Sequence, residues 1–301
     1  MVSEKMIYVK ILFYSFLILG VFCWLLLYNN AHPPRYPLLI PPSDYGLKFE
    51  AVTFETKDGI RLDAWFIPSP SAIGPSSAIV LCHGLGAARS DFTELAASLA
   101  RQGFHTLLFD FRAHGKSGGQ KSSFGWKEKE DLMAAIEYLS KRREVAPGRI
   151  GVYGFSMGGA TALMTAAERK AIRAVVADSS FASLRDQTIA ILETAYGRPF
   201  KPLVYPLMWL YRLYFGIDPE KISPLDVVSQ ISPAAVMIIG GGEDEQMPTS
   251  VAKRLFEAAR DPKELWLIPG AVHGGTLSSA GEEYEQRVGG FFSKYLGAGD
   301  V

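Results

Sequence analysis

Short apolar runs alternate with amphipathic stretches through most of the chain, and this alternation constrains the fold more than any other feature. Runs such as residues 78–82 and 150–153 are brief and almost wholly apolar, as expected for strands buried on both faces of a sheet. The stretches between them place apolar residues three or four positions apart, as in Phe92, Leu95 and Leu99, which is the spacing of one helix face. Strands that alternate with helices predict an α/β fold with a mostly parallel central sheet and helices on both faces.

The individual elements follow from the same patterns. We expect strands at residues 78–82, 106–109, 150–153, 172–177, 236–239 and 264–268, and helices at 91–101, 130–139, 157–168, 251–259 and 282–295. Residues 49–56 and 61–67 alternate around Asp58-Gly59, a pair typical of hairpin turns, so an antiparallel hairpin should precede the parallel strands. Residues 184–230 break the alternation with five prolines and many aromatic residues, and we expect them to form a lid inserted between two strands.

A different kind of segment opens the chain. Residues 11–27 read ILFYSFLILGVFCWLLL and carry no charge. Residues 6–9, before Lys10, are also apolar, and the whole stretch is long enough for a membrane span. A signal peptide has a shorter apolar core and small residues at its cleavage site, and a buried core helix would not be apolar all round. We therefore expect residues 1–30 to be an uncleaved transmembrane anchor and residues 31–48, which are rich in proline, to be an extended linker.

The charges beside this span indicate its orientation. Lys5 and Lys10 lie before it and closer to it than Arg35 and Lys48 after it, which favours a cytoplasmic amino terminus. We thus expect a single-pass membrane protein whose globular domain lies on the non-cytoplasmic side.

Composition excludes several classes of protein. The 31 Lys and Arg residues balance 31 Asp and Glu, which argues against a basic surface for nucleic acid, and 48% hydrophobic residues exclude disorder. Only two cysteines are present, Cys23 and Cys82, too few for a disulfide framework or a thiolate metal cage. The sequence lacks a dinucleotide-binding or Walker motif and a His/Cys cluster, so we expect no cofactor and no metal. Oligomeric state is not indicated.

Residues 154–158 read Gly-Phe-Ser-Met-Gly and match the G-x-S-x-G pattern of a nucleophile on a sharp strand-to-helix turn. The pattern follows a predicted strand and opens a predicted helix rich in small residues, which is the context that it requires. Flanking glycines avoid clashes with neighbouring backbone, and the helix amino terminus is favourable for a developing negative charge. Ser156 is therefore the predicted nucleophile.

A serine nucleophile needs a base and an acid that orients the base. Among five histidines, His273 is the candidate base because its loop leaves the edge of the sheet where Ser156 should lie. Asp244 follows the strand at 236–239 and is the candidate acid, with Glu243 beside it and Asp178 at the end of an earlier strand as alternatives. The chain order Ser156, Asp244, His273 is the order of an α/β-hydrolase.

Residues 49–295 resemble the α/β-hydrolase superfamily, and they are most similar to membrane-anchored serine hydrolases of the BEM46-like type. The motifs that carry the resemblance are residues 81–86 (LCHGLG), 109–117 (FDFRAHGKS), 154–159 (GFSMGG), 241–244 (GGED) with Pro248, and 270–273 (GAVH). The resemblance implies an α/β-hydrolase fold over residues 49–301. It also implies an oxyanion hole formed by the backbone N–H groups of Met157 and of the turn at His83-Gly84-Leu85, with Leu85 as the expected donor.

The motif at residues 109–117 has Ala113 where the family usually has glycine, and we interpret it as a structural turn with an internal Asp110–Arg112 pair. Because residue 156 is serine and not aspartate, the resemblance disfavours a dehalogenase or an epoxide hydrolase.

The sequence thus predicts a cofactor-free serine hydrolase that cleaves a small-molecule or lipid acyl ester or thioester through an acyl-enzyme. A serine peptidase of the same fold and a membrane-tethered scaffold with a dormant triad are the alternatives.

Overall fold

An eight-stranded sheet forms the centre of the protein, with strand order β1-β2-β4-β3-β5-β6-β7-β8. The computed structural model describes residues 2–297. The first two strands pair antiparallel and the last six run parallel to one another. The strands are β1 (Glu50–Glu55), β2 (Arg61–Ile67), β3 (Ser76–Cys82), β4 (His105–Phe109), β5 (Val145–Phe155), β6 (Ile172–Asp178), β7 (Ala235–Gly241) and β8 (Lys263–Ile268).

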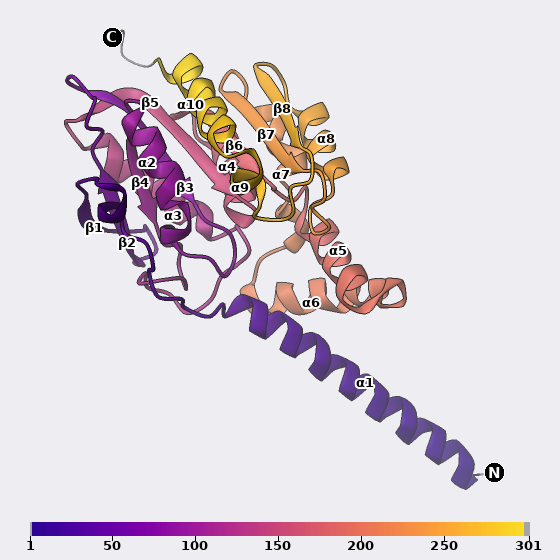
Figure 1. Cartoon of the computed structure of the whole chain (residues 1–301). Coiled ribbons are helices and arrows are strands. Elements are labelled where there is room, and N and C mark those ends of the chain that lie inside the picture. Colours follow the sequence, from indigo (N-terminus) through magenta and orange to yellow (C-terminus); the bar gives the residue numbers. More distant parts are fainter. Residues whose placement is uncertain (1, 298–301) are drawn as a thin grey trace.

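Helices cover both faces of this sheet (Figure 1). The helices packed on one face are α2 (Thr93–Arg101) and α10 (Glu282–Leu296), and those on the other are α3 (Glu128–Ser140), α4 (Met157–Glu168) and α8 (Thr249–Ala258). The fold predicted from the sequence, a mostly parallel sheet between two helical layers, is confirmed.

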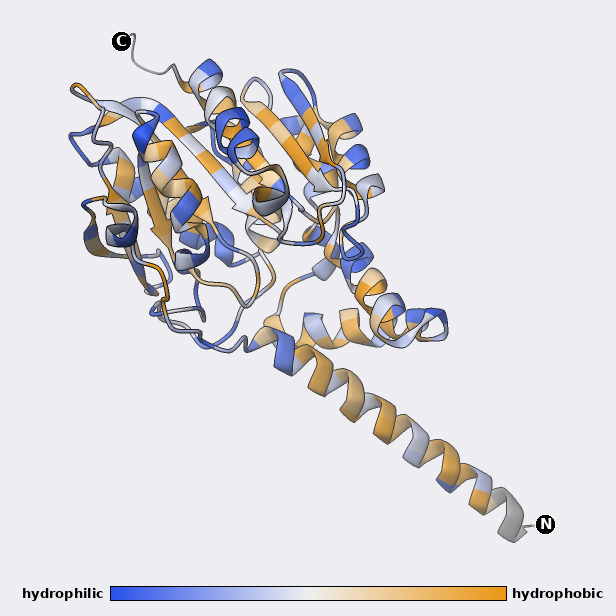
Figure 2. Cartoon of the chain, viewed as in Figure 1, coloured by the Kyte–Doolittle hydropathy of each residue, from blue (hydrophilic) through white to orange (hydrophobic). Residues whose placement is uncertain are grey.

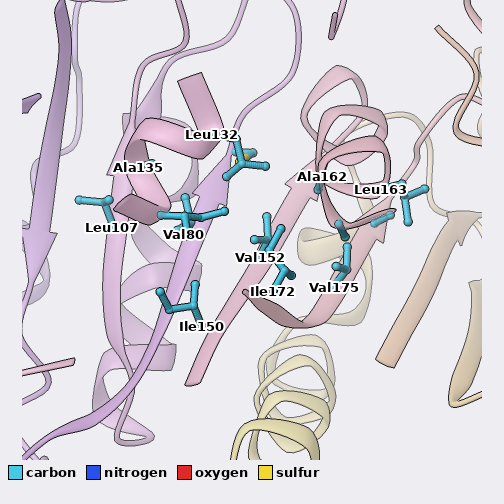
Figure 3. Close-up of a cluster of buried hydrophobic side chains, with 14 of the residues drawn as sticks. Val80, Leu107, Leu132, Ala135, Ile150, Val152, Ala162, Leu163, Ile172 and Val175 are labelled. Carbon is cyan, nitrogen blue, oxygen red and sulfur yellow. The ribbon is translucent and has the colours of Figure 1, made fainter. Parts of the chain in front are cut away.

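Side chains that point to alternate faces along each strand explain why helices are needed on both faces of the sheet. In β3, Val80 points into the cluster beneath α3 and α4, whereas Ile79 and Leu81 point into the cluster beneath α2 and α10. Figure 3 shows Val80 with Val152 and Val175 from the next two strands, packed against Leu132 and other side chains of α3 and α4. A strand that is apolar on both sides can only be buried by helices on both sides.

Residues between β6 and β7 fold as a series of helices that project from the carboxyl edge of the sheet (Figure 1). The longer ones are α5 (Leu184–Tyr196) and α6 (Val204–Phe215), and a short α7 (Pro224–Val227) leads back toward β7. We call residues 184–230 the inserted segment. Prolines stand at the first turns of several of these elements, where a missing N–H is tolerated, so the proline-rich composition is compatible with short helices.

The amino-terminal helix α1 (Val2–Ala31) extends away from the domain and is apolar over most of its length (Figures 1 and 2). Residues Met6–Ala31 have a mean hydropathy of 2.3 over the most apolar window, and only 11% of that window is buried. By length and composition this helix can cross a membrane, a property that signal sequences and some core helices share. Its last three turns differ from the rest because they pack against α6 and bury Cys23 and Leu27.

The chain that follows α1 is tied to the loop after β4. The N–H of Ser122 donates to the carbonyl of Ala31 at 2.8 Å, and the guanidinium of Arg35 donates to four carbonyl groups of that loop. The end of α1 is therefore fixed to the domain by polar contacts as well as by packing.

The expected Asp110–Arg112 pair is wrong. Asp110 instead pairs with Arg89 at 2.6 Å, and Arg112 pairs with Asp131 of α3 at 2.6 Å and with Asp58 at 2.8 Å. Sequence proximity misled the prediction because the tight turn at residues 110–117 points the two side chains to different neighbours. Ala113 in this turn has a φ of 62°, the backbone conformation that explains the glycine usual in the family.

Two ion pairs on α3 provide a test of this packing. Asp131 is fully buried against Arg112, whereas Glu137 forms an exposed pair with Lys57 at 3.8 Å. Breaking a buried pair typically costs about 3–5 kcal/mol, and an exposed pair about 0–1 kcal/mol. We expect Asp131→Ala to lower the thermal unfolding midpoint by roughly 5–10 °C, and Glu137→Ala by no more than about 2 °C. Equal shifts in the two variants would contradict this assignment.

Candidate active site

Ser156 lies between the end of β5 and the start of α4, in a backbone conformation that serine rarely adopts. Its φ is 52° and its ψ is −117°. A Cβ on Gly154 would lie 2.3 Å from the carbonyl oxygen of Gly158, and one on Gly158 would lie 2.3 Å from that of Cys82. Only glycine fits at both positions, so the two glycines of the motif are required by close backbone contact. Strain of this kind is typical of functional sites.

Three side chains predicted from the sequence are brought together at the carboxyl edge of the sheet. The Nε2 atom of His273 lies 3.2 Å from the Oγ atom of Ser156, and its Nδ1 atom lies 2.8 Å from the Oδ2 atom of Asp244. Asp244 follows β7 and His273 follows β8, so both loops leave strands parallel to β5. With a proton on Nδ1, the imidazole donates to the carboxylate and its Nε2 atom is free to accept the hydroxyl proton of Ser156.

The carboxylate of Asp244 is held in place by two backbone hydrogen bonds. Its Oδ1 atom accepts the backbone N–H groups of Gln246 at 3.0 Å and Met247 at 2.7 Å, and its side chain is fully buried. Glu243, the first alternative acid, is exposed on the surface. The structure therefore places Asp244, and not Glu243, beside His273.

Asp178, the second alternative acid, has a different set of contacts. It is buried at the end of β6 and accepts hydrogen bonds from the hydroxyl groups of Tyr284, Thr276 and Ser179. Burial raises the pKa of Asp178, while these hydroxyl donors act in the opposite direction. Thr276 lies three residues after His273, so Asp178 ties the histidine loop to the sheet. No sequence pattern indicates this role, because its partners come from distant segments.

The expected oxyanion donors lie on either side of Ser156. Met157 is the first residue of α4, so its N–H has no acceptor within the helix. Leu85 belongs to the turn after β3, and within residues 2–297 its N–H donates to no backbone carbonyl. Both residues line the cavity that contains Ser156.

Two buried histidines hold the turn that carries Leu85. The Nε2 atom of His83 accepts the N–H of Phe111 at 3.0 Å, and the Nε2 atom of His114 accepts the N–H of Gly86 at 3.1 Å. Burial lowers the pKa of both histidines, so both are neutral and remain acceptors. The sequence pointed to the turn at His83-Gly84-Leu85, but no pattern in it indicated the contribution of His114.

An apolar cavity of about 220 Å³ opens beside Ser156. Its walls come from the inserted segment and, unexpectedly, from α1, with contributions from Leu26, Leu27, Leu184, Leu192, Leu207 and Met208. The sequence predicted residues 1–30 as a separate anchor, and no pattern in it indicated this contact. Among the described residues, no group of three or more His, Cys, Asp or Glu side chains is arranged to hold a metal ion.

Comparisons with known proteins agree on the family. A family model described as the α/β-hydrolase fold matches residues 77–199. The chain is 31% identical to the protein YfhR of Escherichia coli K12 over 254 residues, which cover 82% of this chain and 81% of YfhR. It is 28% identical over 318 residues to the Arabidopsis thaliana protein WAV2, which contains an α/β-hydrolase domain, with 96% of each chain covered.

Solved structures extend the similarity to three dimensions. The esterase Pf2001 of Pyrococcus furiosus superimposes with a TM-score of 0.74 at 28% sequence identity. This match covers 89% of the present chain and 99% of the esterase chain. With its eight-stranded sheet and its strand-to-helix turn at Ser156, the chain belongs to the α/β-hydrolase superfamily.

Proposed function

We propose that the protein is a serine hydrolase that cleaves an acyl ester or thioester through an acyl-enzyme. The observation that carries the proposal is the pair of contacts that link Ser156 to His273 and His273 to Asp244, next to an apolar cavity. The similarity to an archaeal esterase supports ester hydrolysis over amide hydrolysis. The substrate is a small-molecule or lipid acyl compound, and the chemistry requires no cofactor.

The proposed reaction begins when the Oγ atom of Ser156 attacks the acyl carbonyl carbon. His273 takes the serine proton on its Nε2 atom, and Asp244 stabilises the imidazolium that forms. The tetrahedral intermediate collapses, His273 returns the proton to the leaving alcohol or thiol, and an acyl-enzyme remains. Water, activated in the same way by His273, then attacks the acyl-enzyme and releases the acid and free Ser156.

Negative charge on the carbonyl oxygen is stabilised by the backbone N–H groups of Leu85 and Met157 in this mechanism. Donors of this kind act on the charge that develops in the transition state, and removing one typically costs about 10²–10³ in rate. The two neutral histidines, His83 and His114, contribute indirectly because they keep the Leu85 turn in position.

We also propose a role for the regions outside the sheet. Residues 1–30 form a membrane anchor, residues 31–48 connect it to the hydrolase domain of residues 49–301, and the domain lies on the non-cytoplasmic side. The inserted segment acts as a lid that keeps water away from the apolar cavity. Tyr205 and Trp209 of α6 are more than 60% exposed, as expected for side chains at a membrane–water interface.

Substitution of the triad tests the reaction directly. We expect Ser156→Ala and His273→Ala to reduce kcat on an activated ester by about 10⁴–10⁶, and Asp244→Asn by roughly 10³–10⁴. A fluorophosphonate probe should label the wild-type protein at Ser156, and the exposed Ser250→Ala variant should behave like the wild type. Folded wild-type protein that is neither labelled nor active would favour a dormant scaffold.

Membrane extraction tests the anchor. We expect the wild-type protein to stay in the pellet after a carbonate wash. Two charges in the middle of the helix, in the double variant Leu17→Arg and Ile18→Arg, should release it, because each costs about 2.5–3.5 kcal/mol inside a bilayer. Asn29→Arg, near the end of the same helix, is the matched control. A mature chain beginning near residue 31 would show instead that the segment is cleaved.

A chain-length series tests the nature of the substrate. Each buried methylene contributes about 0.8 kcal/mol, so kcat/KM should rise severalfold over a few methylenes until the cavity is full. Hydrolysis of acetyl, butyryl, octanoyl and palmitoyl esters by the full-length protein measures this profile. Fastest turnover of acetyl esters with a steady decline from butyryl onward would indicate a small, polar substrate.

A further inference from the structure

The last three turns of α1 are bound to the domain and are not a free tether. Cys23 is fully buried and Leu27 is 7% exposed, although residues 6–21 of the helix are exposed. Trp24 packs edge-to-face on Tyr214 of α6, with ring centroids 5.2 Å apart. His32, directly after the helix, lies 3.3 Å from the hydroxyl group of the same tyrosine. This end of α1 therefore has one defined position against α6.

That position makes α1 a wall of the cavity that contains the nucleophile. Leu26, Leu27 and Asn30 line the same cavity as Ser156. The Nδ2 atom of Asn30 donates to the carbonyl of Leu26, which keeps its polar side chain engaged with the helix. Leu26 and Leu27 therefore supply apolar surface to the cavity.

The cavity also reaches the surface of the protein beside α1. Ile191 and Tyr196 of α5 line the cavity and are 44% and 41% exposed, so this end is open to the surroundings. Tyr196 packs on Phe22 of α1, with ring centroids 5.6 Å apart. Phe22 belongs to the apolar stretch that can cross a membrane, so the exposed part of the cavity lining lies next to that stretch, and Ser156 lines the same cavity.

We infer that the last three turns of α1 form part of the acyl-binding site, and that the acyl chain of a membrane-borne amphiphile lies between α1 and α5 with its ester carbonyl at Ser156. This inference rests on the proposed hydrolase function. In it, the ester carbonyl lies at Ser156, the acyl chain extends from there along Leu26 and Leu27, which determine its length, and the leaving group lies outside the apolar cavity. The anchor thus selects the substrate as well as the location of the enzyme.

The size and surroundings of the cavity define the substrate class. A cavity of about 150 Å³ holds a benzene molecule, so about 220 Å³ accommodates an acyl chain of roughly eight to ten carbon atoms. Tyr205, Trp209 and Leu213 form an exposed stripe along α6, the helix packed on α1, which would place the open end at the level of the lipid head groups. An amphiphile with one medium-length acyl ester fits these dimensions.

Substitutions in α1 test the inference with a matched control on the same helix. Leu27 lines the cavity, whereas Leu25 is 50% exposed and is not among the cavity residues. With the full-length protein in detergent micelles, we expect Leu27→Trp to lower the ratio of kcat/KM for octanoyl over butyryl esters at least tenfold. Leu27→Ala should shift the optimum to longer chains, and Leu25→Trp should keep the wild-type ratio within twofold. Thermal unfolding midpoints establish that each variant is folded.

A covalent probe tests the same geometry without any substitution. An octyl fluorophosphonate with a photoreactive diazirine at the end of its chain is allowed to react with the full-length protein in phosphatidylcholine nanodiscs. We expect the probe to attach to Ser156 and, after illumination, to cross-link to residues 22–27 of α1 or to α5.

The outcomes separate the two proposals. Cross-links confined to residues outside α1 and α5, together with an unchanged ratio of kcat/KM for octanoyl over butyryl esters in the Leu27 variants, would overturn the inference about α1. The proposed serine hydrolase function would then still stand. Absence of labelling at Ser156 in the wild-type protein would overturn the proposed function itself.

Discussion

The close approach of three backbone segments around Ser156 is the constraint on which the rest of the structure depends. Gly158 at the start of α4 touches the carbonyl groups at the end of β3, and Gly154 touches α4. The N–H of Ser156 donates to the carbonyl of Asp178 on β6 at 2.8 Å. The left-handed backbone of Ser156 persists because β3, β5 and β6 are adjacent and parallel. The sheet therefore acts as the frame that presents the serine hydroxyl to the cavity.

Buried polar groups extend this frame to the loops that surround Ser156. Asp244 is oriented by two backbone N–H groups, Asp178 holds Thr276 behind the histidine loop, and His83 and His114 hold the turn that carries Leu85. Each of these groups is paired, so none incurs the cost of an unsatisfied buried polar atom. In the proposed mechanism, these contacts fix the positions of base, acid and oxyanion donors before a substrate binds, which is the form of organisation that lowers a reaction barrier most effectively.

The amino-terminal helix would link the proposed chemistry to a membrane. Most of α1 is exposed and apolar, and its last turns are packed on α6 beside the cavity. A helix that spans a bilayer and also lines an acyl pocket would bring substrate and nucleophile together without release of the substrate into water. An apolar chain would then exchange one apolar environment for another, so binding would draw less on the hydrophobic effect and more on the fit of the chain.

The sequence by itself determined the order of the elements and predicted Ser156 as nucleophile and His273 as base, because strand periodicity, glycine spacing and chain order can be read directly from the sequence. It predicted Asp244 as the acid but left Glu243 and Asp178 as alternatives. It also gave the apolar character of residues 11–27. Only the tertiary structure decided that Asp110 pairs with Arg89, that Asp178 supports the histidine loop, and that Leu26 and Leu27 line the cavity. These contacts join residues that are far apart in the chain. Such partners are determined by how the helices and loops pack on the sheet, and a local sequence pattern does not contain that information.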